Sequence, residues 1–140
     1  MSVQVLTTEQ FDATVTGNDI VIIDFWAPWC GPCRGFAPVF EKAATENPDV
    51  KFVKVNTDEE QALAGHFGIR SIPTLLVFRE QVIVFQQPGA LPKSALDDLI
   101  RQVRDLDMIE VKRGAVPYGQ DSDDDDDDDG DGDEAPRTLQ

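Results

Sequence analysis

The sequence predicts an α/β fold, in which helices pack against a largely parallel sheet, and three observations favour it. Residues 20–26 are apolar at both odd and even positions, which is typical of a strand covered on both faces. The next segment has apolar residues at helical spacing, at positions 36, 39, 40 and 43. Strand and helix patterns then alternate as far as residue 104, as they do in α/β proteins.

The first three elements are a strand, a helix and a second strand. Residues 3–6 form a short strand candidate. Thr7 and Gln10 have the spacing of a capping box, so a helix should begin after Thr7 and end at residues 17–18, which are Gly and Asn. The apolar run at residues 20–26 is the second strand.

A helix over residues 33–47 and a strand over residues 51–56 follow. The helix contains Pro38, and the strand is rich in Phe and Val. A strand, a helix and a strand in this order predict a right-handed crossover, which makes residues 20–26 and 51–56 parallel neighbours.

The remaining elements are a short helix, an antiparallel pair of strands and a last helix. Asp58 is the predicted N-cap of the short helix, which should end near residues 67–68. Residues 74–78 and 82–86 are the predicted strands, and the turn between them lacks the Gly or Asn of a tight hairpin. The last helix should run from Pro92 to Arg104 with one apolar face, made of Leu96, Leu99, Ile100 and Val103.

Charge divides the chain into three parts. The formal net charge is −15, of which residues 121–140 contribute −10 and residues 1–120 only −5. We therefore expect a domain at residues 1–106, a linker or C-terminal extension at 107–120 and a disordered polyaspartate tail at 121–140. Part of the tail matches the start of a calcium-binding EF-hand loop, but the twelfth position is Pro136 instead of Glu. A solubilising tail is therefore favoured, and docking of a basic partner or tuning of the active site are the alternatives.

Composition also excludes some functions. A mildly acidic domain is unsuited to nucleic acid, which requires clustered Lys and Arg. No apolar run is long enough to span a membrane, and the N-terminus lacks the pattern of a secretory signal. We therefore expect a cytoplasmic protein that binds neither nucleic acid nor membrane.

The two cysteines, Cys30 and Cys33, predict dithiol chemistry. A disulfide between them closes so short a loop that it would stabilise the fold little. Pro32 is typical of a first helical turn, so Cys30 should lie at a helix N-terminus, where an anion is favoured, and be an accessible thiolate. Half of a zinc site or an intersubunit iron–sulfur site is the alternative, but the chain has only two Cys and one His. We expect no metal.

One aspartate and two tryptophans lie close to the cysteines in the sequence. Asp24 lies within an apolar run, so we expect it to be buried, with a raised pKa that suits proton transfer from Cys33. Trp26 continues the strand and should pack in the core, whereas Trp29 should be exposed beside Cys30.

These residues closely resemble the thioredoxin family over residues 3 to about 105. The resemblance rests on a long active-site string, on a second string with Ile-Pro-Thr, and on isolated matches: Asp24-Phe25-Trp26-Ala27-Pro28-Trp29-Cys30-Gly31-Pro32-Cys33, Gly68-Ile69-Arg70-Ser71-Ile72-Pro73-Thr74, Pro38, Lys54 and Asp58. It implies a thioredoxin fold, with a central mixed five-stranded sheet and helices on both faces. It also implies a monomer that reduces protein disulfides without a cofactor other than its own disulfide, and that is recycled by thioredoxin reductase.

Residue roles follow from the same resemblance. Cys30 matches the nucleophile, Cys33 the resolving thiol, Asp24 the buried carboxylate and Lys54 its neighbour. Pro73 matches a cis-proline, and Gly31 and Pro32 support the dithiol. The residues that match the substrate groove are Trp29, Ile72, Pro73, Gly89 and Ala90.

Two other functions remain open at this point. The chain could be a redox-sensing module that binds one partner through the groove and the acidic tail without turnover. It could also be a disulfide oxidase or isomerase, although the Gly31-Pro32 dipeptide resembles the reducing members of the family.

Overall fold

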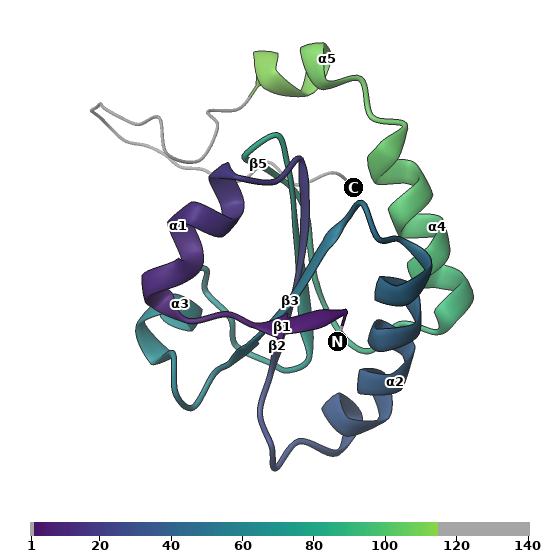
Figure 1. The fold of residues 1–140 in the computed structure, drawn as a ribbon. Helices are drawn as coiled ribbons and strands as arrows, with labels where there is room; N and C mark the ends of the chain where they lie inside the picture. Colours follow the sequence, from purple (N-terminus) through teal and green to yellow (C-terminus); the bar gives the residue numbers. More distant parts are fainter. Residues whose placement is uncertain (1, 115–140) are drawn as a thin grey trace.

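The computed structural model describes residues 2–114. Five strands form one sheet in the order β1-β3-β2-β4-β5 (Figure 1). β1, β3 and β2 are parallel, and β4 and β5 are antiparallel additions at one edge, so the sheet is mixed as expected. The elements in chain order are β1 (Val3–Val5), α1 (Thr8–Thr16), β2 (Ile20–Trp26), α2 (Gly31–Glu46), β3 (Lys51–Asn56), α3 (Gln61–His66), β4 (Thr74–Arg79), β5 (Val82–Pro88), α4 (Lys93–Arg104) and α5 (Met108–Arg113).

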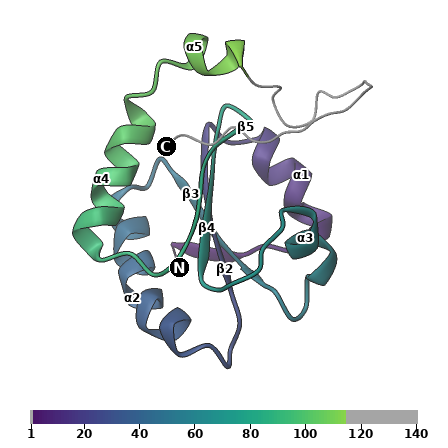
Figure 2. The same cartoon turned by 180° about the vertical axis from the view of Figure 1, so that it is seen from behind.

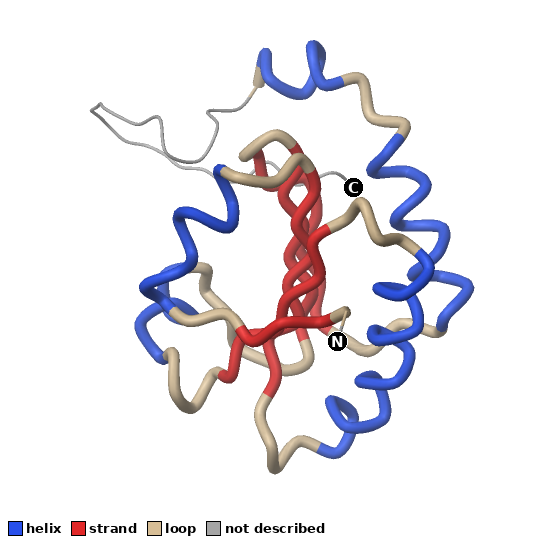
Figure 3. Tube along the Cα trace, in the orientation of Figure 1, coloured by secondary structure: helices blue, strands red, loops and turns tan. Residues whose placement is uncertain are grey.

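Helices cover both faces of the sheet. Figure 1 shows α1 and α3 on one side and α2 and α4 on the other; Figure 2 gives the reverse view, and Figure 3 shows the strands stacked edge-on between them. Successive side chains of β2 pack on opposite faces of the sheet. Ile22 belongs to the apolar cluster with α2 and α4, and Ile23 belongs to the cluster with α1 and α3. Two buried faces explain why this strand is apolar at every position but one.

Most predicted elements are confirmed. β2 and β3 have the predicted bounds and are parallel neighbours. The backbone N–H of Thr7 donates to Gln10 Oε1 at 3.4 Å, as in a capping box, and α1 ends at Thr16. α2 begins at Gly31, two residues earlier than predicted, because Cys30 is its N-cap and Pro32 lies in its first turn.

The start of α3 was predicted incorrectly. The helix begins at Gln61 with Glu60 as its N-cap, so Asp58 does not cap it. Instead, Asn56 Oδ1 accepts from the backbone N–H of Asp58 at 2.9 Å and so holds a turn before the helix.

The hairpin between β4 and β5 closes without glycine. Arg79 pairs with Val82, and the two residues between them, Glu80 and Gln81, have φ of 52° and 70°, a left-handed conformation that tight hairpins require. Tertiary contacts hold this turn: the backbone N–H of Glu80 donates to the carbonyl of Asp19 at 2.7 Å.

Helix α5 lies in the segment predicted to be a linker or extension. Its Met108 is 8% exposed and belongs to the apolar cluster with α2 and α4. Its Lys112 Nζ pairs with Glu80 Oε1 at 2.6 Å, which joins α5 to the β4–β5 turn. The predicted acidic tail, residues 121–140, lies outside the described residues.

None of the helices in residues 2–114 combines the length and the apolar character that crossing a bilayer requires.

Candidate active site

The two cysteines lie where β2 gives way to α2, and they form a disulfide. Their Cα atoms are 5.2 Å apart. The backbone N–H of Cys33 donates to Cys30 Sγ at 3.1 Å, so the first turn of the helix presents a donor to this sulfur. That donor and the helix dipole would both stabilise a thiolate at Cys30 once the disulfide is reduced.

Cys30 is less exposed than the sequence led us to expect. It keeps 4% of its accessible surface and Cys33 keeps 2%. Ala27 and the partly buried side chains of Trp26 and Ile72 pack against the disulfide. Both sulfur-bearing residues are therefore buried in the oxidised form, with Cys30 slightly the more exposed.

Asp24 is buried, as predicted, at 3% exposure. It has the same parity as Ile22, so it lies on the side of the sheet covered by α2, whose first turn contains Cys33. Its Oδ1 atom has no hydrogen-bond partner among the described residues. Burial raises the pKa of Asp24 to about 7, and the positive charge of Lys54 opposes that rise.

Lys54 is close to both Asp24 and Trp26. Lys54 lies opposite Asp24 in the register of β3 and β2. Its Nζ is 5.0 Å from the centre of the Trp26 ring, a cation–π contact. Trp26 is half-buried and not fully in the core, and its Nε1 is buried without a hydrogen-bond partner in residues 2–114.

The segment before β4 lies beside the disulfide. The Ile72–Pro73 peptide bond is cis, which confirms the expectation from the resemblance. The carbonyl oxygen of Ile72 is 3.7 Å from Cys30 Sγ. The carbonyl of Pro73 accepts from the backbone N–H of Gly89 at 2.7 Å, so the end of β5 is brought to the same place. Ala90, the next residue, is exposed.

Trp29 is 67% exposed, as predicted, and its indole has a partner that the sequence did not indicate. Its Nε1 donates to Asp58 Oδ2 at 2.9 Å. In the sequence, only Asn56, a residue type that favours turns, indicated that Asp58 lies in a turn before the helix and not at its N-cap. On the other side of the cysteines, Arg34 Nη1 donates to the carbonyl of Pro28 at 2.9 Å, and Gly31 and Pro32 are exposed at the helix start.

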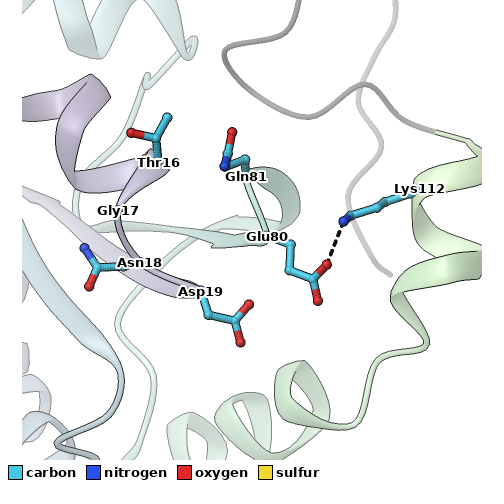
Figure 4. A pocket seen from close by; sticks show the side chains of 7 residues that line it. All are labelled: Thr16, Gly17, Asn18, Asp19, Glu80, Gln81 and Lys112. Carbon is cyan, nitrogen blue, oxygen red and sulfur yellow. Dashed lines mark ion pairs between the residues drawn. The ribbon is translucent and has the colours of Figure 1, made fainter.

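The pocket drawn in Figure 4 is separate from this site. It is lined by residues from the end of α1, the loop before β2, the β4–β5 turn and α5, namely Thr16, Gly17, Asn18, Asp19, Glu80, Gln81 and Lys112. The disulfide follows the carboxyl end of β2, so the pocket lies at the opposite end of the sheet. Figure 4 also shows the ion pair of Glu80 with Lys112.

The chemistry that the site can perform follows from the bond between the two sulfurs. The two sulfurs bond to each other, an arrangement suited to two-electron exchange. No cluster of three or more potential metal-ligating side chains occurs in residues 2–114.

Comparisons with known proteins agree with this geometry. The family model described as Thioredoxin matches residues 2–102. A relative from Streptomyces coelicolor, a putative thioredoxin 2 by its name, is 62% identical over 108 residues, covering 77% of this chain and 81% of the relative. A thioredoxin from Haemophilus influenzae is 49% identical over 94 residues, covering 66% and 88%. Among solved structures, a mutant thioredoxin from Halobacterium salinarum is similar with a TM-score of 0.68 and 38% identity, over 74% of this chain and 91% of that one.

Members of the matched family exchange thiols and disulfides through a disulfide of their own and need no bound cofactor. The fold, the Cys30–Cys33 disulfide at the start of α2 and the similarity over most of the chain lead to one conclusion. The chain belongs to the thioredoxin family and is a protein-disulfide oxidoreductase.

Proposed function

We propose that the chain reduces protein disulfides, with Cys30 as the nucleophile and Cys33 as the resolving thiol. The Cys30 thiolate attacks one sulfur of a substrate disulfide, and the other substrate sulfur leaves as a thiolate. The Cys33 thiolate then attacks Cys30 Sγ, which releases the second substrate sulfur. Two electrons pass to the substrate, and the Cys30–Cys33 disulfide of the structure is the product.

One observation supports the order of attack above all others. The backbone N–H of Cys33 donates to Cys30 Sγ, and no equivalent bond to Cys33 Sγ occurs among the described residues. Cys30 is the helix N-cap, where the dipole favours negative charge, whereas Cys33 lies within the first turn. Cys30 is therefore the thiol more readily ionised.

Asp24 is proposed as the proton acceptor for Cys33. A carboxyl with a pKa of about 7 exists in both protonation states near neutrality, so it can take up a proton and release it again. Its place on the α2 side of the sheet supports this role, and Lys54 keeps the pKa from rising further.

The groove for a protein substrate is proposed to consist of the residues around Cys30. The exposed indole of Trp29 offers apolar contact on one side, and the segment of Ile72 and Pro73 borders the sulfur on the other. Gly89 and Ala90 extend this border, since Gly89 is hydrogen-bonded to Pro73. Gly31 and Pro32 are exposed at the helix start, and Gly31 has no side chain that could obstruct a substrate.

The proposed partners are disulfide-containing proteins as substrates and thioredoxin reductase as the electron donor, which are the usual partners in this family. We place the chain in the cytoplasm, since a dithiol that must return to the reduced state suits a reducing compartment. A monomer is sufficient, because the dithiol, the carboxyl and the groove residues all come from one chain. A binding module without turnover is not favoured.

Trapping tests the role of each cysteine. Cys33→Ser should accumulate a mixed disulfide between Cys30 and a substrate such as insulin, because the resolving thiol is missing. Cys30→Ser is the matched control and should form no such adduct at Cys33. Adducts on Cys33 in place of Cys30, or none with either variant, would overturn the assignment. Catalysis of insulin reduction by dithiothreitol, followed by turbidity, separates a reductase from a binding module.

A further inference from the structure

Two polar side chains are buried among the described residues, Asp24 and Thr74. Asp24 is the proposed proton acceptor for Cys33, whereas Thr74 has no role in the proposed mechanism. Thr74 is 4% exposed, and a buried hydroxyl must find a partner or incur a free-energy cost. Its partner therefore indicates what the residue does.

The hydroxyl of Thr74 closes the segment that precedes it. Thr74 is the first residue of β4, and its backbone is paired with Phe25 of β2 and with Pro88 of β5. Thr74 Oγ1 donates to the carbonyl of Ser71 at 2.6 Å. A residue fixed in the sheet from both sides thus holds a carbonyl three residues earlier.

This bond bears directly on the reactive sulfur. Ser71 and Pro73 flank Ile72, whose carbonyl oxygen lies 3.7 Å from Cys30 Sγ. Both flanking carbonyls are held, that of Ser71 by Thr74 Oγ1 and that of Pro73 by the N–H of Gly89. The hydrogen bonds on either side of Ile72 therefore fix the position of its peptide group beside the disulfide.

We propose that Thr74 is a positioning residue, whose hydroxyl sets the distance between the Ile72–Pro73 segment and Cys30 and so shapes the groove for protein substrates. The inference rests on the proposed function. Without the hydroxyl, the Ser71 carbonyl loses its partner and the segment can move relative to the sulfur. A protein disulfide, which must fit between this segment and Trp29, is affected more than a small disulfide, which needs only the sulfur.

The test compares two substrates in the wild type, two variants of Thr74 and one control variant. Wild type, Thr74→Val and Thr74→Ser are reduced, freed of reductant and mixed with insulin or with the small aromatic disulfide dithiobis(nitrobenzoic acid). Oxidation of the chain is followed by acid quench, thiol alkylation and mass spectrometry. Valine has the shape of threonine without the hydroxyl, and serine keeps the hydroxyl. A further control, Thr45→Val, removes a hydroxyl bonded to a carbonyl on the exposed surface of α2.

Thr74→Val should lower the rate constant for insulin about fivefold, the equivalent of one ordinary hydrogen bond, and change that for the small disulfide less than about twofold. Thr74→Ser should restore the ratio of the two rate constants, and Thr45→Val should leave it unchanged. An unchanged ratio in Thr74→Val, even with a lower melting temperature, would overturn the inference and leave the proposed function intact. A wild type that reduces neither substrate would instead refute the proposed function.

Discussion

Asp24 and Lys54 lie directly opposite each other on the neighbouring parallel strands β2 and β3. Both have the parity of residues that pack under α2, Ile22 on β2 and Phe52 on β3, so the carboxyl and the ammonium share one side of the sheet. Burial of Asp24 opposes its ionisation and Lys54 favours it, with burial the larger effect. The pair therefore sets the pH at which this carboxyl gains or loses its proton.

Stability should depend on pH through Asp24. Its pKa is about 7 in the folded chain and 3.8 when exposed, so between these values the folded chain holds a proton that the unfolded chain has lost. The free energy of unfolding should therefore fall by about 4 kcal/mol as pH rises from about 4 to about 7.5, and level off above that. Urea unfolding of wild type and Asp24→Asn at each pH isolates this carboxyl from the other acidic groups. A difference between the two proteins that stays constant with pH would refute the prediction.

Removal of Lys54 should move the same titration upward. Lys54→Met deletes the positive charge that favours the carboxylate, so the pKa of Asp24 should rise above about 7. NMR titration of the Asp24 carboxyl carbon measures this directly in the oxidised protein. Lys51→Met is the matched control, since Lys51 lies on the same strand but opposite Val21, at the far end of β2. The prediction fails if both variants titrate as wild type does.

The sequence predicted best where one local pattern determines the structure. The run at residues 20–26 is apolar because both of its faces are covered, and its bounds match β2. The polar exception in that run, Asp24, was found for the same reason. The cysteines and Pro32 placed the helix start to within two residues.

The sequence predicted the structure poorly where contacts between residues far apart in the chain determine the local conformation. Asp58 has the chemistry of an N-cap, but it binds the indole of Trp29, 29 residues earlier in the chain. The φ angles of Glu80 and Gln81 are unfavourable for these residue types, and contacts to Asp19 and Lys112 hold the turn. Such contacts leave no periodic signal in a single sequence.

Helix α5 has only six residues, too few for a helical period to be recognised, yet it should contribute to stability. Met108 is 8% exposed within the core, whereas Ile109 beside it is 72% exposed. Met108→Ala should lower the free energy of unfolding by about 2 to 3 kcal/mol, and Ile109→Ala by less than about 0.5 kcal/mol. Insulin reduction should be unchanged in both, because α5 lies at the end of the sheet opposite the start of α2 (Figure 1), where the disulfide is. Equal losses of stability in urea unfolding would show that α5 does not pack as described.

The bond from Trp29 Nε1 to Asp58 Oδ2 should matter for substrate reduction more than for stability. Trp29 is exposed, so the bond adds little to the folded state, but it fixes the orientation of an indole beside Cys30. Asp58→Ala should lower kcat/KM for insulin about fivefold, and Asp58→Asn, which keeps an acceptor oxygen, should lower it less. If Asp58 acts only through the indole, Asp58→Ala should have no further effect in a Trp29→Phe background. Fully additive losses in this double-mutant cycle would show that Asp58 contributes independently, by its charge or through the turn that Asn56 holds.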